Sequence, residues 1–188
     1  MPTTQTKIEF IWDDRCPLTQ ASGTLRFEAV DTPANEGVFA HAVRSCLIGS
    51  LDVSDQRLIA LKGLSDAVRS YVRPNPVFSF DRAWWRLAYD PAGELAGFTQ
   101  PVIFRNSERD GGLHEGSLHY IGVLPAFRGK GYVDALLCET TAILRDVGVW
   151  RIYCDTDEHN TPMIKSFERA GYRRGKMRTL EYQVKPPS

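Results

Sequence analysis

The chain has 188 residues, of which 43% are hydrophobic and 24% are charged. This composition fits one soluble domain with a substantial apolar core, because domains commonly span roughly 100–200 residues. The 23 Lys and Arg residues balance the 23 Asp and Glu residues, which argues against a protein held on nucleic acid by its phosphates. No stretch reaches the roughly 18 apolar residues of a membrane span, so no membrane partner is expected either.

The first half of the chain predicts two short strands followed by two helices. Residues 1–22 are polar, lack the apolar run of a signal peptide and are expected to form an N-terminal extension of a cytoplasmic protein. Thr32 can cap free N–H groups and Pro33 suits the first position of a helix, while Gly63 marks a point where the second helix can break. In chain order the expected elements are a strand at 8–12, a strand at 25–30, a helix from Pro33 to Gly49 and a helix from about Ser54 to Pro74.

The second half predicts a meander of strands and then alternating helices and strands. The Pro and Gly of the segment at 90–93 suit a tight turn, and Pro101 marks a bulge or a sheet edge. After residue 123 the apolar residues recur every three or four positions, which is typical of a helix. The expected elements are strands at 84–89, 94–104 and 117–123, a helix at 130–147, a strand at 149–154, a helix at 161–170 and a strand at 172–184. This order predicts one α/β domain with a mixed sheet.

Neither a disulfide framework nor a metal site is predicted. The four cysteines form no CxxC pair, so all are expected to be reduced, mostly buried thiols: Cys16, Cys46, Cys138 and Cys154. His114, Glu115 and His119 approach the HExxH zinc motif, but the second histidine comes one residue too late to share a helix face with the first. The acidic run at 155–159 is expected to be a loop before a helix, with contact to a cationic substrate as the alternative.

The most informative segment joins a strand to a long helix at residues 121–133. Its sequence is Ile-Gly-Val-Leu-Pro-Ala-Phe-Arg-Gly-Lys-Gly-Tyr-Val. The first N–H groups of a helix have no internal partner and carry partial positive charge, and glycines let a phosphate approach the backbone. Gly129 and Gly131 therefore predict an anion site at the start of this helix, and Arg128 and Lys130 add charge to it.

Two well-known phosphate-binding patterns are excluded by their spacing. The P-loop pattern needs glycine where Leu124 stands, and Ser or Thr where Gly131 stands. The dinucleotide-binding pattern, started at Gly129, needs glycine where Asp134 stands. The anion site must therefore be of another kind.

The segment resembles motif A of the GNAT superfamily of acyl-CoA-dependent N-acetyltransferases, in which R/Q-x-x-G-x-G/A wraps the pyrophosphate of coenzyme A. The matching pattern here is Val123-x-Pro125-x-x-Arg128-Gly129-x-Gly131. A second run, residues 160–172, is similar to the family's second cofactor helix. The resemblance covers roughly residues 84–183. It implies a single GNAT-like acyltransferase domain over residues 1–188, with a mixed, mostly antiparallel sheet flanked by helices and with 84–183 as its cofactor-binding core.

The resemblance also implies acetyl-CoA as co-substrate, no metal, and direct acetyl transfer to a primary amine of a small molecule or peptide. The residues that it assigns to acetyl-CoA are Ile121, Val123, Arg128, Gly129, Lys130, Gly131, Tyr132, Val133, Asn160 and Phe167. Asn160 is expected to bond the pantetheine arm or the adjoining loop, and backbone N–H groups between Ile121 and Val123 are expected to stabilise the oxyanion. Two residues depart from the family pattern. Val133 replaces Gly or Ala, and Phe167 replaces a tyrosine that protonates the departing thiolate in many members.

A base is expected on the amine side, because an ammonium group must lose a proton before it attacks a thioester. Alternate side chains of a strand share a face, which places Glu115, Ser117 and His119 together. His119 titrates near neutrality and is the first candidate for the catalytic base, with Glu115 as the second. The alternative interpretation of His119 is a surface or core histidine, and that of Glu115 is a solvated loop carboxylate.

Other classes of function stay open at this point. Phe167 leaves room for a non-catalytic acyl-CoA-binding module, and a transferase of the same fold that uses a longer acyl or an aminoacyl donor is a third interpretation. The helical pair at 31–76 shapes the acceptor side in such folds, but it carries no specificity code. The basic cluster at 173–178 is expected to be solvated, with contact to the 3′-phosphate of coenzyme A or to an acidic substrate as the alternative. Exposed sheet edges leave room for a homodimer.

Overall fold

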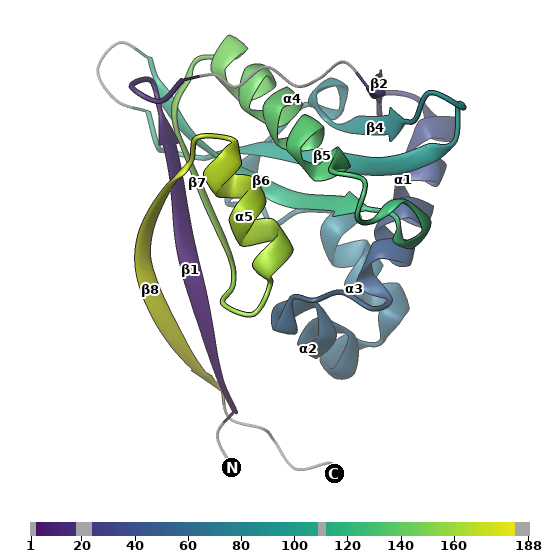
Figure 1. The fold of residues 1–188 in the computed structure, drawn as a ribbon, viewed down its shortest axis with the longest axis horizontal. Helices are drawn as coiled ribbons and strands as arrows, with labels where there is room; N and C mark the ends of the chain where they lie inside the picture. Colours follow the sequence, from purple (N-terminus) through teal and green to yellow (C-terminus); the bar gives the residue numbers. More distant parts are fainter. Residues whose placement is uncertain (1–2, 18–23, 109–111, 183–188) are drawn as a thin grey trace.

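The protein consists of an open, mixed sheet with helices packed on both faces (Figure 1). The computed structural model describes residues 3–17, 24–108 and 112–182. Its strands are β1 (Thr3–Asp13), β2 (Arg26–Ala29), β3 (Phe78–Ser79), β4 (Arg86–Tyr89), β5 (Leu95–Phe104), β6 (His114–Val123), β7 (Val149–Asp157) and β8 (Arg173–Tyr182). Its helices are α1 (Pro33–Leu47), α2 (Val53–Lys62), α3 (Leu64–Val72), α4 (Tyr132–Asp146) and α5 (Thr161–Arg169), with 3-10 turns at Arg82–Trp84 and Pro125–Phe127.

The strands follow the order β2-β4-β5-β6-β7-β1-β8, and β3 pairs with β5 beside this path. Among the strands of the described ranges, β6 and β7 run parallel and every other pair runs antiparallel. Helix α4 supplies the crossover that a parallel pair needs. The predicted single α/β domain with a mixed, mostly antiparallel sheet is therefore confirmed.

The N-terminal segment lies inside the sheet, between β7 and β8. Of the extension expected at 1–22, residues 3–13 form β1, and residues 1–2 and 18–22 lie outside the described ranges. The sequence predicted only a strand at 8–12, because Gln5 and Lys7 interrupt the apolar pattern before it. Both side chains are nevertheless buried: Gln5 donates to Asp157 at 3.0 Å and Lys7 donates to Asp52 at 2.7 Å. Hydrogen-bond partners thus allow polar residues to occupy buried positions of β1.

The helix signals of the first half are confirmed. Thr32 Oγ1 accepts a hydrogen bond from the backbone N–H of Asn35 at 3.2 Å, and Pro33 is the first residue of α1. Gly63 ends α2 and precedes α3 with a φ of 78°, in the left-handed region that glycine adopts readily. The helix therefore breaks where the sequence allowed it to.

Several boundaries of the second half differ from the prediction. Strand β4 begins at Arg86 rather than at residue 84, because Arg82–Trp84 form a 3-10 turn capped by the side chain of Asp81. Strand β7 continues to Asp157, so the first residues of the acidic run are strand rather than loop. The two-residue strand β3 is too short to show a period in sequence. Residues 109–111, between the expected strands at 94–104 and 117–123, and residues 183–184 of the expected last strand lie outside the described ranges.

Apolar cores fill the space on the two sides of the sheet. One packs α4 and α5 against β1 and β7, with members that include Phe10, Trp12, Leu137, Ile152 and Phe167. The other packs α1 and α3 against β4 and β5, with members that include Phe39, Val43, Ala67, Trp85 and Phe98. Among the described residues, no helix has both the length and the apolar character needed to cross a membrane.

Candidate active site

Strands β6 and β7 separate near the centre of the sheet. Their pairing ends at Gly116 and Ile152, although both strands continue for several residues. His119 is an extra residue in β6, because its neighbours Leu118 and Tyr120 pair with consecutive residues of β5. Such a β-bulge bends the strand that contains it, which accounts for the divergence of β6 from β7.

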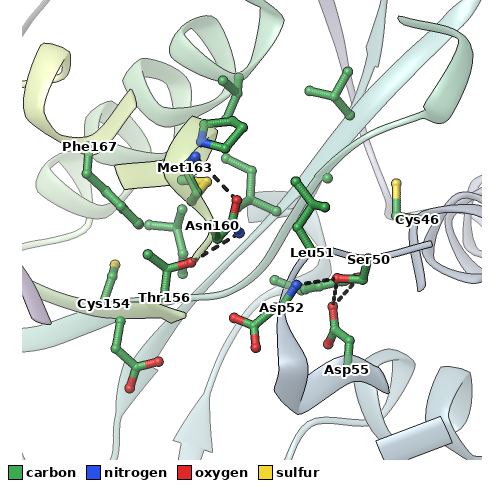
Figure 2. A pocket seen from close by; sticks show the side chains of 18 of the residues that line it. Cys46, Ser50, Leu51, Asp52, Asp55, Cys154, Thr156, Asn160, Met163 and Phe167 are labelled. Carbon is green, nitrogen blue, oxygen red and sulfur yellow. Dashed lines mark hydrogen bonds between the residues drawn. The ribbon is translucent and has the colours of Figure 1, made fainter. Parts of the chain in front are cut away.

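A cavity of about 780 Å³ occupies the gap between the diverging strands. Figure 2 shows Asn160, Met163 and Phe167 on one side of it and Ser50 and Asp55 on the opposite side. Small-molecule sites commonly have volumes of roughly 300–1,000 Å³. The cavity is therefore the candidate active site, with one wall from α5 and the motif A segment and the other from the loop between α1 and α2.

The segment predicted to bind an anion lines one end of the cavity. Gly129 and Gly131 have φ values of 81° and 77°, which glycine adopts readily. Helix α4 begins at Tyr132, and no side chain caps its free N–H groups. A Cβ placed on either glycine would meet no other group within 4 Å, so the space over the loop is open. These features fit the pyrophosphate of coenzyme A.

The two cations of this loop point in different directions. Arg128 lines the cavity, and its guanidinium donates to the backbone oxygens of Val123 at 3.3 Å and Gly49 at 3.2 Å. It thereby joins the motif A segment to the loop between α1 and α2. Lys130 does not line the cavity, and its Nζ lies 4.8 Å from the ring centroid of Phe127 in a cation–π contact.

The other residues predicted to hold acetyl-CoA all line the cavity: Ile121, Val123, Gly129, Gly131, Tyr132, Val133, Asn160 and Phe167. Asn160 is the N-cap of α5, where its side chain accepts from the N–H of Met163 at 3.4 Å and donates to Thr156 Oγ1 at 3.2 Å. These bonds tie the start of α5 to the end of β7. Asn160 therefore shapes the cavity wall through both elements.

Phe167 is part of the core as well as of the cavity wall. Its side chain is 2% exposed and stacks on Phe10 with ring centroids 4.8 Å apart, while the ring of Tyr172 lies 5.2 Å away. A phenylalanine ring has no proton to donate. Tyr172 does not replace it as a donor toward the cavity, because its hydroxyl is buried against Thr141 at 2.7 Å.

The two candidate bases lie in different surroundings. His119 lines the cavity, packs on the rings of Tyr71 and Phe78, and has no hydrogen-bond partner for Nε2 among the described residues. Burial lowers the pKa of His119 to about 4, so the imidazole is neutral near physiological pH. Glu115 does not line the cavity and accepts a hydrogen bond from Arg151 at 2.8 Å. The structure thus brings only the first candidate to the site.

Asp55 is a cavity residue that sequence reasoning missed. It lies in the first turn of α2, is 3% exposed, and accepts hydrogen bonds from the hydroxyls of Ser50, Tyr71 and Tyr120. Burial raises the pKa of the Asp55 carboxyl. The tyrosines are 16 and 65 residues away along the chain, so no local pattern could have brought these groups together.

The remaining charged groups of the cavity are paired. Lys7 Nζ lies 2.7 Å from Asp52 and 3.7 Å from Asp155, and Arg178 lies 3.3 Å from Asp155. Arg178 belongs to the basic cluster predicted to be solvated, and the side chains of β8 that carry this cluster are exposed. Two of its cations pair with carboxylates of β1 and β7: Arg173 donates to Asp13, and Arg178 lies 3.1 Å from Glu9 and 3.3 Å from Asp155.

The family model described as acetyltransferase (GNAT) family matches residues 61–172 of the sequence. The chain belongs to this acetyltransferase family. The match includes the loop at Gly129 and Gly131 and the run that begins at Asn160. The GNAT resemblance of motif A and of the second helix is therefore confirmed.

Curated relatives of this GNAT protein match part of its length. The mycothiol acetyltransferase of Salinispora tropica is 40% identical over 96 residues, which cover 50% of this chain and 30% of that protein. The mycothiol acetyltransferase of Pseudarthrobacter chlorophenolicus is 31% identical over 108 residues, which cover 56% of this chain and 32% of that protein. Each match thus spans about a third of the relative's length.

Solved structures share the GNAT fold at low sequence identity. An acetyltransferase of the GNAT family from Colwellia psychrerythraea superposes with a TM-score of 0.61 at 13% identity, covering 97% of this chain and 57% of that one. The structure of AAC(6′)-Iy in complex with the bisubstrate analog CoA-S-monomethyl-acetylneamine has a TM-score of 0.54 at 16% identity, covering 86% of this chain and 99% of that one. These likenesses support the fold.

Proposed function

We propose that this GNAT protein transfers an acetyl group from acetyl-CoA directly to a primary amine of a small molecule or peptide. The observation that carries the proposal is the open, uncapped start of α4 at Gly129 and Gly131, which forms one end of a cavity that continues to a separate, polar wall. The relatives named as mycothiol acetyltransferases and the AAC(6′)-Iy complex favour a small-molecule amine. Amino sugars are therefore the first acceptors to try.

The residues of motif A and α5 have defined tasks in this proposal. Backbone N–H groups from Gly129 to Val133 would hold the pyrophosphate, as a helix start does for anions. Asn160 and Phe167 would line the path of the pantetheine arm, since both lie on the cavity wall. Acetyl-CoA supplies the acetyl group as a reactive thioester. Beyond Gly116, β6 has no pairing with β7, which leaves backbone donors near Ile121 and Val123 for an oxyanion.

His119 is the proton acceptor that we propose for the incoming amine. His119 is among the residues that line the cavity, and its buried Nε2 has no hydrogen-bond partner in the described part of the chain. Burial lowers the pKa of His119 to about 4, so this nitrogen carries no proton near neutral pH, but the ring is a weaker base than the imidazole titrating near neutrality that the sequence predicted. Glu115 is not retained, because its carboxylate is paired with Arg151 outside the cavity wall.

Phe167 supports a second candidate function, a non-catalytic acyl-CoA-binding module. The cavity wall at this position offers a buried ring and no proton donor. Acyl transfer needs no such donor when the leaving thiol is moderately acidic, with a pKa of about 8–9 for ordinary thiols, so we place acetyl transfer first. A longer acyl donor would be revealed by competition with acetyl-CoA for the same cavity.

The chemistry of the cysteines supports a cytoplasmic location, which we propose together with the activity. All four cysteines are free, and Cys46, Cys138 and Cys154 are buried. Burial raises the pKa of the thiols of Cys46 and Cys154 to about 12. Such neutral, reduced thiols are typical of proteins from reducing compartments.

A thermal-shift titration with acetyl-CoA tests the cofactor site. A ligand at about 100 times its dissociation constant stabilises a protein by roughly 2.7 kcal/mol, which corresponds to an increase in Tm on the order of 5–10 °C for this size. We expect a saturable increase for the wild type and none for Gly131→Glu, whose carboxylate would occupy the anion site.

Gly93→Glu is the matched control for this variant. Gly93 also has a positive φ, 83°, and a Cβ added there would meet no other group within 4 Å, but it lies in the turn between β4 and β5, outside the cavity. Its titration with acetyl-CoA should match the wild type. Release of free thiol on addition of glucosamine, beyond the hydrolysis of acetyl-CoA alone, would then establish turnover. A folded wild type that gives no shift would contradict the proposal.

A further inference from the structure

Asp55 presents a buried carboxyl group to the cavity wall opposite α5 (Figure 2). Ser50 Oγ donates to Oδ2 at 2.6 Å, Tyr120 donates to the same oxygen at 3.1 Å, and Tyr71 donates to Oδ1 at 2.5 Å. An ionised carboxylate has about four acceptor sites. The three hydroxyls therefore leave one of them for a ligand.

No cation of the described residues pairs with this carboxyl group. Within residues 3–17, 24–108 and 112–182, Asp55 takes part in no ion pair, whereas Asp52 and Asp155 both lie within 4.0 Å of Lys7. Arg128, on the motif A segment, directs its guanidinium hydrogen bonds to backbone oxygens instead. Asp55 is thus the carboxyl group of the cavity whose negative charge a cationic ligand would balance.

Burial without a cation is costly for a carboxylate, because its charge loses hydration. The groups that face Asp55 supply no positive charge: Asp52 is an acid on the same helix end, and Tyr71, Tyr120 and Cys46 all have a raised pKa and stay neutral. Three hydroxyl bonds favour ionisation but do not neutralise it. An ionisable group with a perturbed pKa beside a cavity is characteristic of functional sites.

The surroundings of Asp55 also suit an organic cation. The rings of Tyr71, Phe78 and Phe104 line the same cavity, and aromatic faces attract ammonium groups. His119, whose ring packs on that of Tyr71, is neutral because burial lowers its pKa. It therefore does not repel a positive ligand.

We infer that Asp55 pairs with the ammonium group of the acceptor, so that the protein selects cationic amines over neutral molecules of the same shape. The inference rests on the proposed function for the existence of an acceptor and adds the property by which it is recognised. Asp55 is then the specificity-determining residue of the acceptor side. Ser50, Tyr71 and Tyr120 are positioning residues, because they hold its carboxyl group toward the cavity.

Matched pairs of probes test this directly. We would measure the dissociation constants of glucosamine against glucose and of cyclohexylmethylamine against cyclohexylmethanol by calorimetry, with and without acetyl-CoA. The wild type should bind at least one amine about tenfold or more tightly than its alcohol, a difference that one buried ion pair can supply. Asp55→Asn should remove this preference and leave the affinity for acetyl-CoA unchanged. Asp66→Asn, the same change at an exposed site on α3 outside the cavity, should retain the preference.

The pH dependence of amine binding provides a second test that does not require Asp55→Asn to fold. Amine affinity should fall as pH is lowered through the pKa of Asp55. Tyr71→Phe and Ser50→Ala each remove one hydrogen bond that lowers this pKa, so they should move the midpoint of that fall to higher pH. A merely structural role for Asp55 would leave the midpoint where it is.

The outcomes separate this inference from the proposed function. Any of three outcomes would overturn the role of Asp55. The wild type could bind amine and alcohol equally in both pairs, the folded wild type could bind none of the probes, or the preference for amines could survive in Asp55→Asn. Failure to bind acetyl-CoA would overturn the proposed function instead, since the probe pairs are also measured without it. If Asp55→Asn loses the preference for amines and still binds acetyl-CoA, the result would support both the role of Asp55 and the proposed function.

Discussion

The rings of Tyr71 and Tyr120 stack with centroids 4.1 Å apart, and both hydroxyls donate to the carboxyl group of Asp55. Tyr71 belongs to α3 and Tyr120 to β6, next to the bulge at His119. The pair therefore fixes α3 against β6, the strand that precedes the loop with Gly129 and Gly131. The Asp55 carboxyl group of α2 thus links α3 and β6 at this wall of the cavity.

Tyr71→Phe should lower the free energy of unfolding by about 1–3 kcal/mol, because it removes a buried hydrogen bond to an ionisable acceptor. Urea denaturation near neutral pH measures this difference. Tyr89→Phe is the control, since the Tyr89 hydroxyl bonds Glu28 at a more exposed site, and we expect a change within about 0.5 kcal/mol. Equal costs for the two variants would show that the bond to Asp55 adds no stability.

His119 should make the stability of the protein depend on pH. Burial lowers its pKa to about 4, below the value of about 6.5 in an unfolded chain. The neutral ring therefore stabilises the folded state fully above about pH 6.5, and this contribution is lost as pH falls toward 4, by an amount on the order of 3 kcal/mol. Urea denaturation across this range should show that the free energy of unfolding declines less steeply for His119→Phe than for the wild type. Phenylalanine at this position retains the ring contacts. If the free energy of unfolding declines equally in the two proteins, the pKa of His119 is the same in the folded and the unfolded chain.

The open helix start at one end of the cavity could be predicted because its determinants are adjacent in sequence. Gly129, Gly131 and the start of α4 follow one another, so their spacing alone indicates an uncapped helix start. The side-chain cap of α1 and the apolar stripes of α1 and α4 are equally local. The order of strands and helices along the second half of the chain followed from the alternation of turns and periodic segments.

The end of the cavity at Asp55 could not be predicted, because its groups converge only in the folded chain. Asp55, Tyr71 and Tyr120 come from three elements and show no common pattern in sequence. The place of β1 was missed for a related reason. Gln5 and Lys7 are polar yet buried, since partners from β7 and the start of α2 satisfy them, and polarity alone therefore suggested an exposed extension.

Asn160→Ala should lower the free energy of unfolding by about 1 kcal/mol, because it removes the side-chain cap of α5. Asn160→Asp keeps an acceptor for the N–H of Met163 but loses the amide that donates to Thr156. We expect the Asp variant to retain most of the stability, and thermal unfolding compares the two. A Tm for Asn160→Ala equal to that of the wild type would show that the cap is replaced by solvent.

Asp55→Asn should become more stable relative to the wild type as pH rises. Burial raises the pKa of Asp55 above its unfolded value, so the folded state binds this proton more tightly than the unfolded chain. The stability that this provides is complete below the unfolded pKa of about 3.9 and is lost as pH rises through the folded pKa. Asparagine has no such proton, and thermal unfolding of both proteins from about pH 4 to pH 8 follows the difference.

The difference between the two proteins isolates Asp55 from the other groups that titrate in this range. Asp155 also has a raised pKa, but it is present in both and cancels unless the substitution alters it. A Tm difference that widens with pH by a few degrees, at about 2–4 °C per kcal/mol for a domain of this size, would show that the ionised carboxyl group lowers the stability of the folded chain. A difference that is constant with pH would show that Asp55 ionises as freely in the folded protein as in the unfolded chain, and would remove the electrostatic reason for assigning it to a cationic acceptor.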